Sequence, residues 1–195
     1  MNGAPDVPDV DDDGWLVGVR RCPSPNCDAR PPDAAIELLV IHNISLPPGV
    51  FGGGTIEALF TNRLDPHAHP FLATLAGLRV SSHFLIERDG RVTQFVSCLA
   101  RAWHAGASAF EGRRACNDFS LGVELEGTDF VAFEAVQYAA LARLTRALRA
   151  RYPLRAVRGH QHVALERKTD PGPFFDWRRF ATAAALPAAL LPPTD

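Results

Sequence analysis

A short apolar run near residue 40 limits the folds that this chain can adopt. Residues 36–41 are aliphatic except for Glu37 and partly β-branched, the composition of a buried strand. The run leads directly into His42 and Asn43, and α/β folds place ligands at the carboxyl ends of such strands. A histidine that only fills a core would normally sit within the strand. The pattern therefore favours a functional His42.

Other stretches predict the remaining strands. Residues 82–88 and 91–95 have strand composition on either side of Asp89-Gly90, a pair typical of a hairpin with a type I′ turn. Residues 120–126 alternate as a strand does, and residues 156–158 form a further short strand. Residues 107–119 are expected to be loop.

Helical spacing is clearest in residues 134–151, which end at Tyr152-Pro153. The positions expected on its buried face are Val136, Ala140, Leu144, Ala147 and Leu148. A short helix capped by Thr55 should run to Phe60, and a last helix should begin at Trp177.

The stretch from Arg158 to Pro173 carries the strongest chemical signal. His160 follows a predicted strand, and Lys168 and Asp170 lie in a loop bracketed by glycine and proline. Neutral imidazole and carboxylate are good zinc ligands, and His42 supplies a third one from another strand end. Two histidines and one carboxylate leave the fourth position of Zn²⁺ open, as in hydrolytic sites. From this stretch alone, a solvated loop with a helix-capping Asp170 remains equally open.

Further histidines and one tryptophan need separate interpretation. His67 and His69 have the spacing to chelate a metal, but their proline-rich polar surroundings favour a surface loop. A packed, hydrogen-bonded role is the better interpretation of His83. Trp103, in the run Arg101 to Gly106, is either a stacking platform for a sugar or peptide, or part of the core.

Within strand 120–126, either Glu124 or Glu126 can face a cleft, and periodicity alone also allows a solvated face. A cysteine hydrolase built on Cys98 or Cys116 with His104 is a weaker alternative, because neither thiol has an evident orienting base.

Composition excludes several classes of protein. The chain has 195 residues, enough for a single domain, and a net charge of −2 that gives no reason to expect a nucleic-acid or anionic membrane partner. The four cysteines are too scattered for a disulfide scaffold, and the chain shows no signal peptide or spanning run. We therefore expect a cytoplasmic protein with reduced thiols. Residues 1–13 and 183–195 are expected to be tails around a domain of 14–182.

Four stretches together resemble the zinc-dependent N-acetylmuramoyl-L-alanine amidases, which share a fold with peptidoglycan recognition proteins and phage amidase lysozymes. They are residues 40–49, 101–106, 116–127 and 167–173. The resemblance covers about 14–182 and is strongest to the cytoplasmic 1,6-anhydro branch of cell-wall recycling, the AmpD type. It implies an α/β (α+β) fold with a central mixed sheet flanked by helices.

The same resemblance implies site residues, one position at a time. His42, His160 and Asp170 would bind one Zn²⁺ per chain. Glu124 would be the catalytic carboxylate, and Lys168 would stabilise negative charge. The substrate contacts would be Asn43, Arg79 and Trp103. The expected substrate is an anhydro-muropeptide, cut between N-acetylmuramic acid and L-alanine, and the expected state is a monomer.

The chain departs from the family pattern at several positions. Ala115 stands where an arginine is expected, with Arg114 one place earlier. Leu165 replaces a usual proline and His162 a small polar residue, changes that concern the stiffness of the loop. Ser82 stands where lysozyme-like relatives have tyrosine, which favours the recycling branch. A non-catalytic peptidoglycan-binding module and a secreted wall-lytic amidase are the rival functions. A non-catalytic module would be expected to lack a metal ligand.

Overall fold

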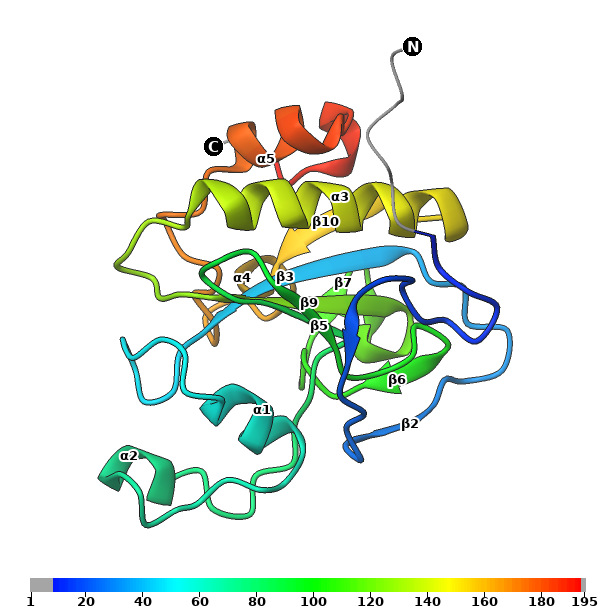
Figure 1. The fold of residues 1–195 in the computed structure, drawn as a ribbon. Helices are drawn as coiled ribbons and strands as arrows, with labels where there is room; N and C mark the ends of the chain where they lie inside the picture. The colour runs from blue at the N-terminus through cyan, green and yellow to red at the C-terminus, as the bar shows by residue number, and fades with distance from the viewer. Residues whose placement is uncertain (1–8, 194–195) are drawn as a thin grey trace.

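A six-stranded mixed sheet forms the centre of the protein in the computed structural model, which describes residues 9–193 (Figure 1). Its strands stand in the order β1-β5-β4-β9-β3-β10. Their bounds are β1 Arg20–Arg21, β3 Leu38–Ile44, β4 Phe84–Ile86, β5 Val92–Gln94, β9 Ser120–Glu126 and β10 Ala156–Gly159. Of the pairs in this sheet, β4–β5 is antiparallel and the others are parallel. The mixed sheet implied by the resemblance is confirmed.

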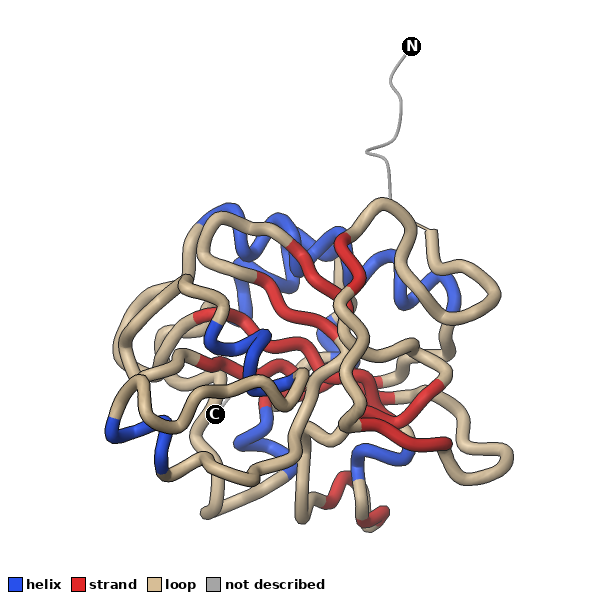
Figure 2. The backbone as a smooth tube through the Cα atoms, turned by 60° about the horizontal axis from the view of Figure 1, so that its bottom comes forward, coloured by secondary structure: helices blue, strands red, loops and turns tan. Residues whose placement is uncertain are grey.

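Shorter elements surround the sheet. Two small antiparallel ribbons are β2 Cys27–Ala29 with β6 Ala100–Ala102, and β7 Ala109–Phe110 with β8 Arg113–Arg114. The helices are α1 Thr55–Phe60, α2 Pro70–Ala73, α3 Ala135–Arg151, α4 His160–Val163 and α5 Trp177–Ala184, with 3₁₀ turns η1 Cys116–Asp118 and η2 Ala188–Leu190. Much of the remaining chain is loop (Figure 2). No helix within residues 9–193 is long and apolar enough to cross a membrane.

The two longest strands of the sheet, β3 and β9, run parallel over their whole length. Leu38 pairs with Ser120 at one end and Ile44 with Glu126 at the other. β9 has the bounds predicted for it, and all seven of its residues are buried. β3 differs from the prediction, because its pairing with β9 continues beyond Ile41 and takes in His42 and Asn43. His42 and Asn43 therefore lie within β3 itself, still near its carboxyl end.

Helices α3 and α5 cover one face of the sheet (Figure 1). Leu39 and Ile41 of β3 pack there in one core with Leu144 of α3 and Phe180 of α5. Helix α3 begins one residue later than predicted, and the side chain of Gln137 accepts a hydrogen bond from the backbone of its N-cap, Glu134. Of the five positions expected to be buried, four are, whereas Val136 is 49 % exposed.

Helices α1 and α2 lie on the opposite side of the sheet (Figure 1). Ile56 and Phe60 of α1 pack with Leu85 and Phe95 in a second core. The predicted cap was wrong: Thr55 is the first residue of α1, and Gly54 precedes it in the left-handed conformation, with φ 74° and no side-chain cap. Glycine adopts that conformation without steric cost.

Two loop predictions also differ. In the hairpin β4–β5, only Gly90 of the expected pair has positive φ, and its N–H donates to the carbonyl of Glu87. This is the pattern of a three-residue loop with glycine in the left-handed position, so a type I′ turn was wrong. Residues 107–119 are not wholly loop, because β7, β8 and η1 form within them.

Both expected tails are partly folded onto the domain. Val10 is buried and forms a bridge with Leu16, and Asp11 accepts a hydrogen bond from the Trp15 amide. At the other end Leu186 is buried, and the carbonyl of Leu190 accepts from Arg158. Residues 1–8 and 194–195 of the predicted tails lie outside the described residues.

Candidate active site

Three side chains from separate segments converge at the carboxyl end of the sheet. His42 lies on β3, and His160 follows β10, whose Gly159 pairs with Ile41. The loop carrying Asp170 is held against α4 by a hydrogen bond from Gln161 N–H to the Asp170 carbonyl, 2.9 Å long. The parallel pairing of β3 and β10 thus brings residues 118 positions apart into contact.

The three donor atoms fit a tetrahedral metal. His42 Nδ1 lies 3.0 Å from His160 Nδ1 and 3.0 Å from Asp170 Oδ2, and the last two atoms are 3.2 Å apart. Two ligand atoms at about 2.0–2.1 Å from a tetrahedral zinc ion would be about 3.3 Å apart. Within residues 9–193, no other group of three His, Cys, Asp or Glu side chains is arranged to hold a metal ion.

The charge states suit metal ligands. Burial lowers the pKa of His42 to about 4, so its imidazole is neutral near pH 7. For Asp170, burial favours the protonated form, but the neighbouring His160 and His42 side chains outweigh it and hold the pKa of the carboxyl below its usual value. The cluster therefore presents the neutral imidazole of His42 and the ionised carboxylate of Asp170, the forms in which these groups bind metals.

Glu124 is the cross-strand neighbour of His42. It is 9 % exposed, and its Oε2 has no hydrogen-bond partner among the described residues. Burial, and secondarily the charge of Asp170, raises its pKa well above the usual value, with Lys168 acting in the opposite direction. A buried carboxyl whose pKa is raised in this way, beside a candidate metal site, is suited to exchange protons during a reaction.

The structure separates Glu124 from Glu126, which the sequence alone did not. Glu126 pairs with Ile44, one step further along the strand, and its carboxylate accepts hydrogen bonds from the amides of Gly52 and Arg88. Its oxygens are thus engaged in holding two loops.

Lys168 is exposed and lies between two hollows. One, of about 600 Å³, is lined by Asn43, Asp129 and Asp170 among others. The other, of about 250 Å³, is lined by Arg79, Trp103 and His160 among others. Lys168 borders both, so the structure groups the predicted substrate residues around the cluster of His42, His160 and Asp170.

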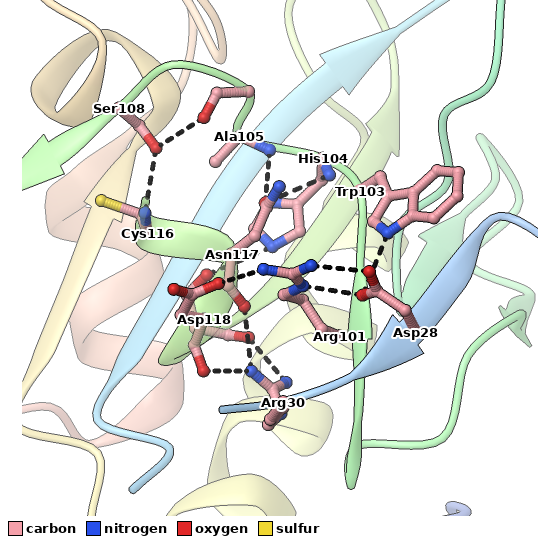
Figure 3. Close-up of polar contacts among 12 residues, drawn as sticks. Asp28, Arg30, Arg101, Trp103, His104, Ala105, Ser108, Cys116, Asn117 and Asp118 are labelled. Atoms are coloured by element: carbon pink, nitrogen blue, oxygen red, sulfur yellow. Dashed lines mark hydrogen bonds and ion pairs between the residues drawn. The ribbon is translucent and has the colours of Figure 1, made fainter. Parts of the chain in front are cut away.

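These substrate candidates differ in how firmly they are held. The Asn43 amide donates to Asp129 Oδ1 and to the Pro171 carbonyl, at 2.6 and 3.1 Å. The Trp103 indole donates to Asp28 Oδ1 at 3.2 Å, so Trp103 is tied at the surface and is not a core residue (Figure 3). Arg79 is exposed.

The remaining histidines and cysteines take structural places. His83 is fully buried, and its Nδ1 accepts from the Gly122 amide, which confirms the packed role. His69 caps α2 through its Nδ1, and His67 is exposed. Burial raises the pKa of the Cys98 thiol to about 12 and also raises that of Cys116, so neither is a ready thiolate nucleophile.

Of the two groups that orient the histidines of the cluster, sequence reasoning expects His104 to support the metal site or the core, but it does not find the Ala105 carbonyl. His42 Nε2 contacts His104 Nδ1 at 2.9 Å, and His160 Nε2 lies 3.1 Å from the Ala105 carbonyl. Every residue has a backbone carbonyl, so the sequence does not show which carbonyl orients a histidine. In the sequence, only the adjacent Trp103 and His104 draw attention to this segment.

Comparison with known proteins decides the family. The family model described as N-acetylmuramoyl-L-alanine amidase matches residues 32–173. The chain belongs to that family. A protein of Salmonella typhimurium strain SL1344 is 58 % identical to this chain over 177 residues, 90 % of this chain and 95 % of the relative. One from Escherichia coli K12 is 59 % identical over 169 residues, 86 % of this chain and 92 % of the relative. Both are named 1,6-anhydro-N-acetylmuramyl-L-alanine amidase AmpD.

Solved amidase structures show the same fold. A crystal structure of a selenomethionine AmpD derivative superposes with a TM-score of 0.86 at 57 % identity, covering 88 % of this chain and 97 % of that one. The Escherichia coli amidase AmiD, in complex with anhydro-N-acetylmuramic acid-L-Ala-D-γ-Glu-L-Lys, gives a TM-score of 0.59 at 32 % identity, covering 92 % of this chain and 66 % of that one.

Proposed function

We propose that this chain is a zinc-dependent amidase that cleaves the bond between 1,6-anhydro-N-acetylmuramic acid and the L-alanine of muropeptides, in peptidoglycan recycling. The observation that carries the proposal is the convergence of His42, His160 and Asp170 beside the buried Glu124, whose Oε2 has no hydrogen-bond partner within residues 9–193. The similarity to AmpD amidases over 90 % of this chain supports the substrate class.

The chain's own residues would divide the chemistry as follows. Zn²⁺ held by His42, His160 and Asp170 supplies Lewis-acid activation. Glu124 accepts a proton from the attacking water and later delivers it to the departing amine of L-alanine. Lys168 places a positive charge where the amide carbonyl oxygen becomes negative.

Binding would use the two hollows on either side of Lys168. Asn43 is positioned in one of them by Asp129 and Pro171. In the other, the Trp103 ring offers a stacking surface, and the guanidinium of Arg79 suits a carboxylate of the peptide. We further propose one zinc ion per chain, a monomeric enzyme without nucleic-acid or membrane partners, and a cytoplasmic location, as for the recycling branch that the chain resembles.

Zinc content measured together with amidase activity tests this function. The purified full chain should contain about one equivalent of zinc and release peptide from anhydro-muropeptides. Glu124→Ala should keep the zinc and lose the activity, because Glu124 is not a ligand. A zinc-loaded wild-type protein that binds muropeptides without cutting them would instead identify a peptidoglycan-binding module. Full activity of a zinc-free protein would refute the metal's role.

A further inference from the structure

The dipeptide His104-Ala105 contacts both histidines that we propose as metal ligands. It contacts them through Nε2, the ring nitrogen that does not face the other ligands. His42 Nε2 lies 2.9 Å from His104 Nδ1, and His160 Nε2 lies 3.1 Å from the Ala105 carbonyl. A neutral imidazole that offers Nδ1 to a metal carries its proton on Nε2. Each histidine therefore donates its Nε2–H to this one dipeptide.

The His104 ring is itself fixed. Because its Nδ1 accepts from His42, its Nε2 carries the proton and donates to Ser120 Oγ at 3.2 Å. The ring lies directly against Gly122, where a Cβ would be 2.6 Å from His104 Cγ. The absence of a side chain at residue 122 thus makes room for this acceptor.

A single side chain holds the dipeptide backbone. Asn117 Oδ1 accepts from the Ala105 amide at 2.8 Å and from the His104 amide at 3.3 Å (Figure 3). Asn117 is held in turn, since its carbonyl accepts from Arg30 at 3.0 Å. One amide oxygen thus sets the place of both acceptors that orient the metal histidines.

We propose that Asn117 is a positioning residue for the metal centre. It acts through His104 and Ala105, whose acceptor atoms select the tautomer and the orientation of His42 and His160. The inference rests on the proposed function, since it takes these two histidines as metal ligands. Partners of metal-binding histidines typically contribute about 10- to 100-fold to metal affinity.

The test is the zinc dissociation constant of the full chain, measured by competition with a chelator. Asn117→Ala removes the acceptor and should raise the dissociation constant by about 10-fold or more. Asn117→Asp keeps an oxygen at the same position and should restore affinity close to wild type. Asp118→Ala is the matched control, because it truncates the next residue of η1 and loses an ion pair with Arg101 instead. It should bind zinc like wild type.

The melting temperature of each metal-free variant shows whether a loss of zinc affinity arises at the metal centre or from a general loss of stability. If Asn117→Ala binds zinc as tightly as wild type, or if Asp118→Ala weakens zinc equally, the inference is overturned and the proposed function stands. A wild-type protein that binds no zinc would overturn the ligand assignment and the inference together.

A second pair of variants serves if Asn117→Ala does not fold. His104→Leu removes the acceptor for His42, whereas His104→Asn keeps an oxygen near the place of Nδ1. If His104-Ala105 orients the two histidines, zinc should bind more weakly to the leucine variant, and asparagine should restore the affinity. Equal affinities of the two variants would overturn the inference. The visible spectrum of the Co²⁺-loaded forms gives a readout independent of turnover, and it should shift in the leucine variant only.

Discussion

At the scale of single residues, burial and neighbours place three ionisable groups in three different states within one cluster. His42 is neutral because burial lowers its pKa to about 4, and Asp170 is ionised because the two neighbouring histidine side chains hold its pKa below the usual value. Glu124 has a pKa well above its usual value because it is buried and because the charge of Asp170 acts in the same direction. Each state suits the role we propose: two ligands and one proton-exchanging carboxyl.

Removal of a ligand should abolish metal binding and activity together. In His42→Ala and in Asp170→Ala, two donors remain, too few for a tight zinc site. We expect less than stoichiometric zinc by elemental analysis and no measurable amidase activity. A full equivalent of zinc in Asp170→Ala would show that the ligand set is wrong.

Glu124→Gln preserves shape but cannot accept a proton. We expect kcat to fall by about 10²–10⁴ with zinc retained. Because Glu124 must be ionised to act as a base, activity should rise as the pH passes its raised pKa, and this acidic limb should vanish in the variant. Glu126→Gln is the matched control and should keep the limb. Near-wild-type turnover of Glu124→Gln would place the base elsewhere.

Lys168→Ala should lower the rate and move the acidic limb to higher pH. It removes a charge near the carbonyl oxygen, so we expect kcat to fall by about 10²–10³. Because the charge of Lys168 lowers the pKa of Glu124, its loss should also raise the pH at which the acidic limb appears. Lys168→Arg should recover only part of the rate, since a planar guanidinium replaces a compact ammonium, but it should return the limb toward its wild-type position. A limb that stays in place in the alanine variant would show that the charge of Lys168 does not act on Glu124.

At the scale of elements, the sequence predicts what local pattern determines. The bounds of β9 agree with the prediction and those of α3 differ by one residue, because their periodicities are long and regular. The β4–β5 turn type and the exposure of Val136 could not be predicted, since they depend on how one element meets another. A Cβ on Gly90 would lie 3.0 Å from the Val136 carbonyl, so the start of α3 lies against that turn.

The site shows the same division. His42, His160 and Asp170 could be predicted because strand ends and a motif mark them, and the structure brings them together. The contribution of Asn117 could not be predicted from the sequence, because Asn117 acts through backbone amides that every residue except proline carries.

The exposure pattern of α3 can be tested with two truncations on one helix. Leu144→Ala empties a buried position and should lower the free energy of unfolding by about 2–5 kcal/mol. Val136→Ala, at an exposed position, should change it by no more than about 0.5 kcal/mol. Urea denaturation measures both. Equal losses would mean that Val136 is packed, as the periodicity alone suggested.

At the scale of the whole molecule, buried histidines make the metal-free protein sensitive to acid. Burial lowers the pKa of His42 to about 4 from the ordinary 6.5, and lowers those of His83 and His104 well below 6.5. The unfolded chain then binds more protons than the folded one, so stability should fall as pH drops from 6.5 toward 4.

Glu124, whose pKa is raised, has the opposite effect on the pH dependence of stability. Glu124→Gln should therefore melt higher than wild type at pH 7 and lose stability more steeply on acidification. Thermal melts of the zinc-free proteins between pH 6.5 and 4 measure this change in stability. A melting temperature of Glu124→Gln that does not change with pH would contradict the prediction.

The long separation of the two histidines along the chain links metal supply to folding. His42 and His160 are 118 positions apart, so their meeting depends on the pairing of β3 with β10, and the unfolded chain offers no equivalent site. A ligand that binds only the native state shifts the folding equilibrium by mass action, by about 2.7 kcal/mol at a free concentration 100 times its dissociation constant. Zinc availability would then set the lifetime of the protein as well as its turnover, and the melting temperature would serve as a gauge of free zinc.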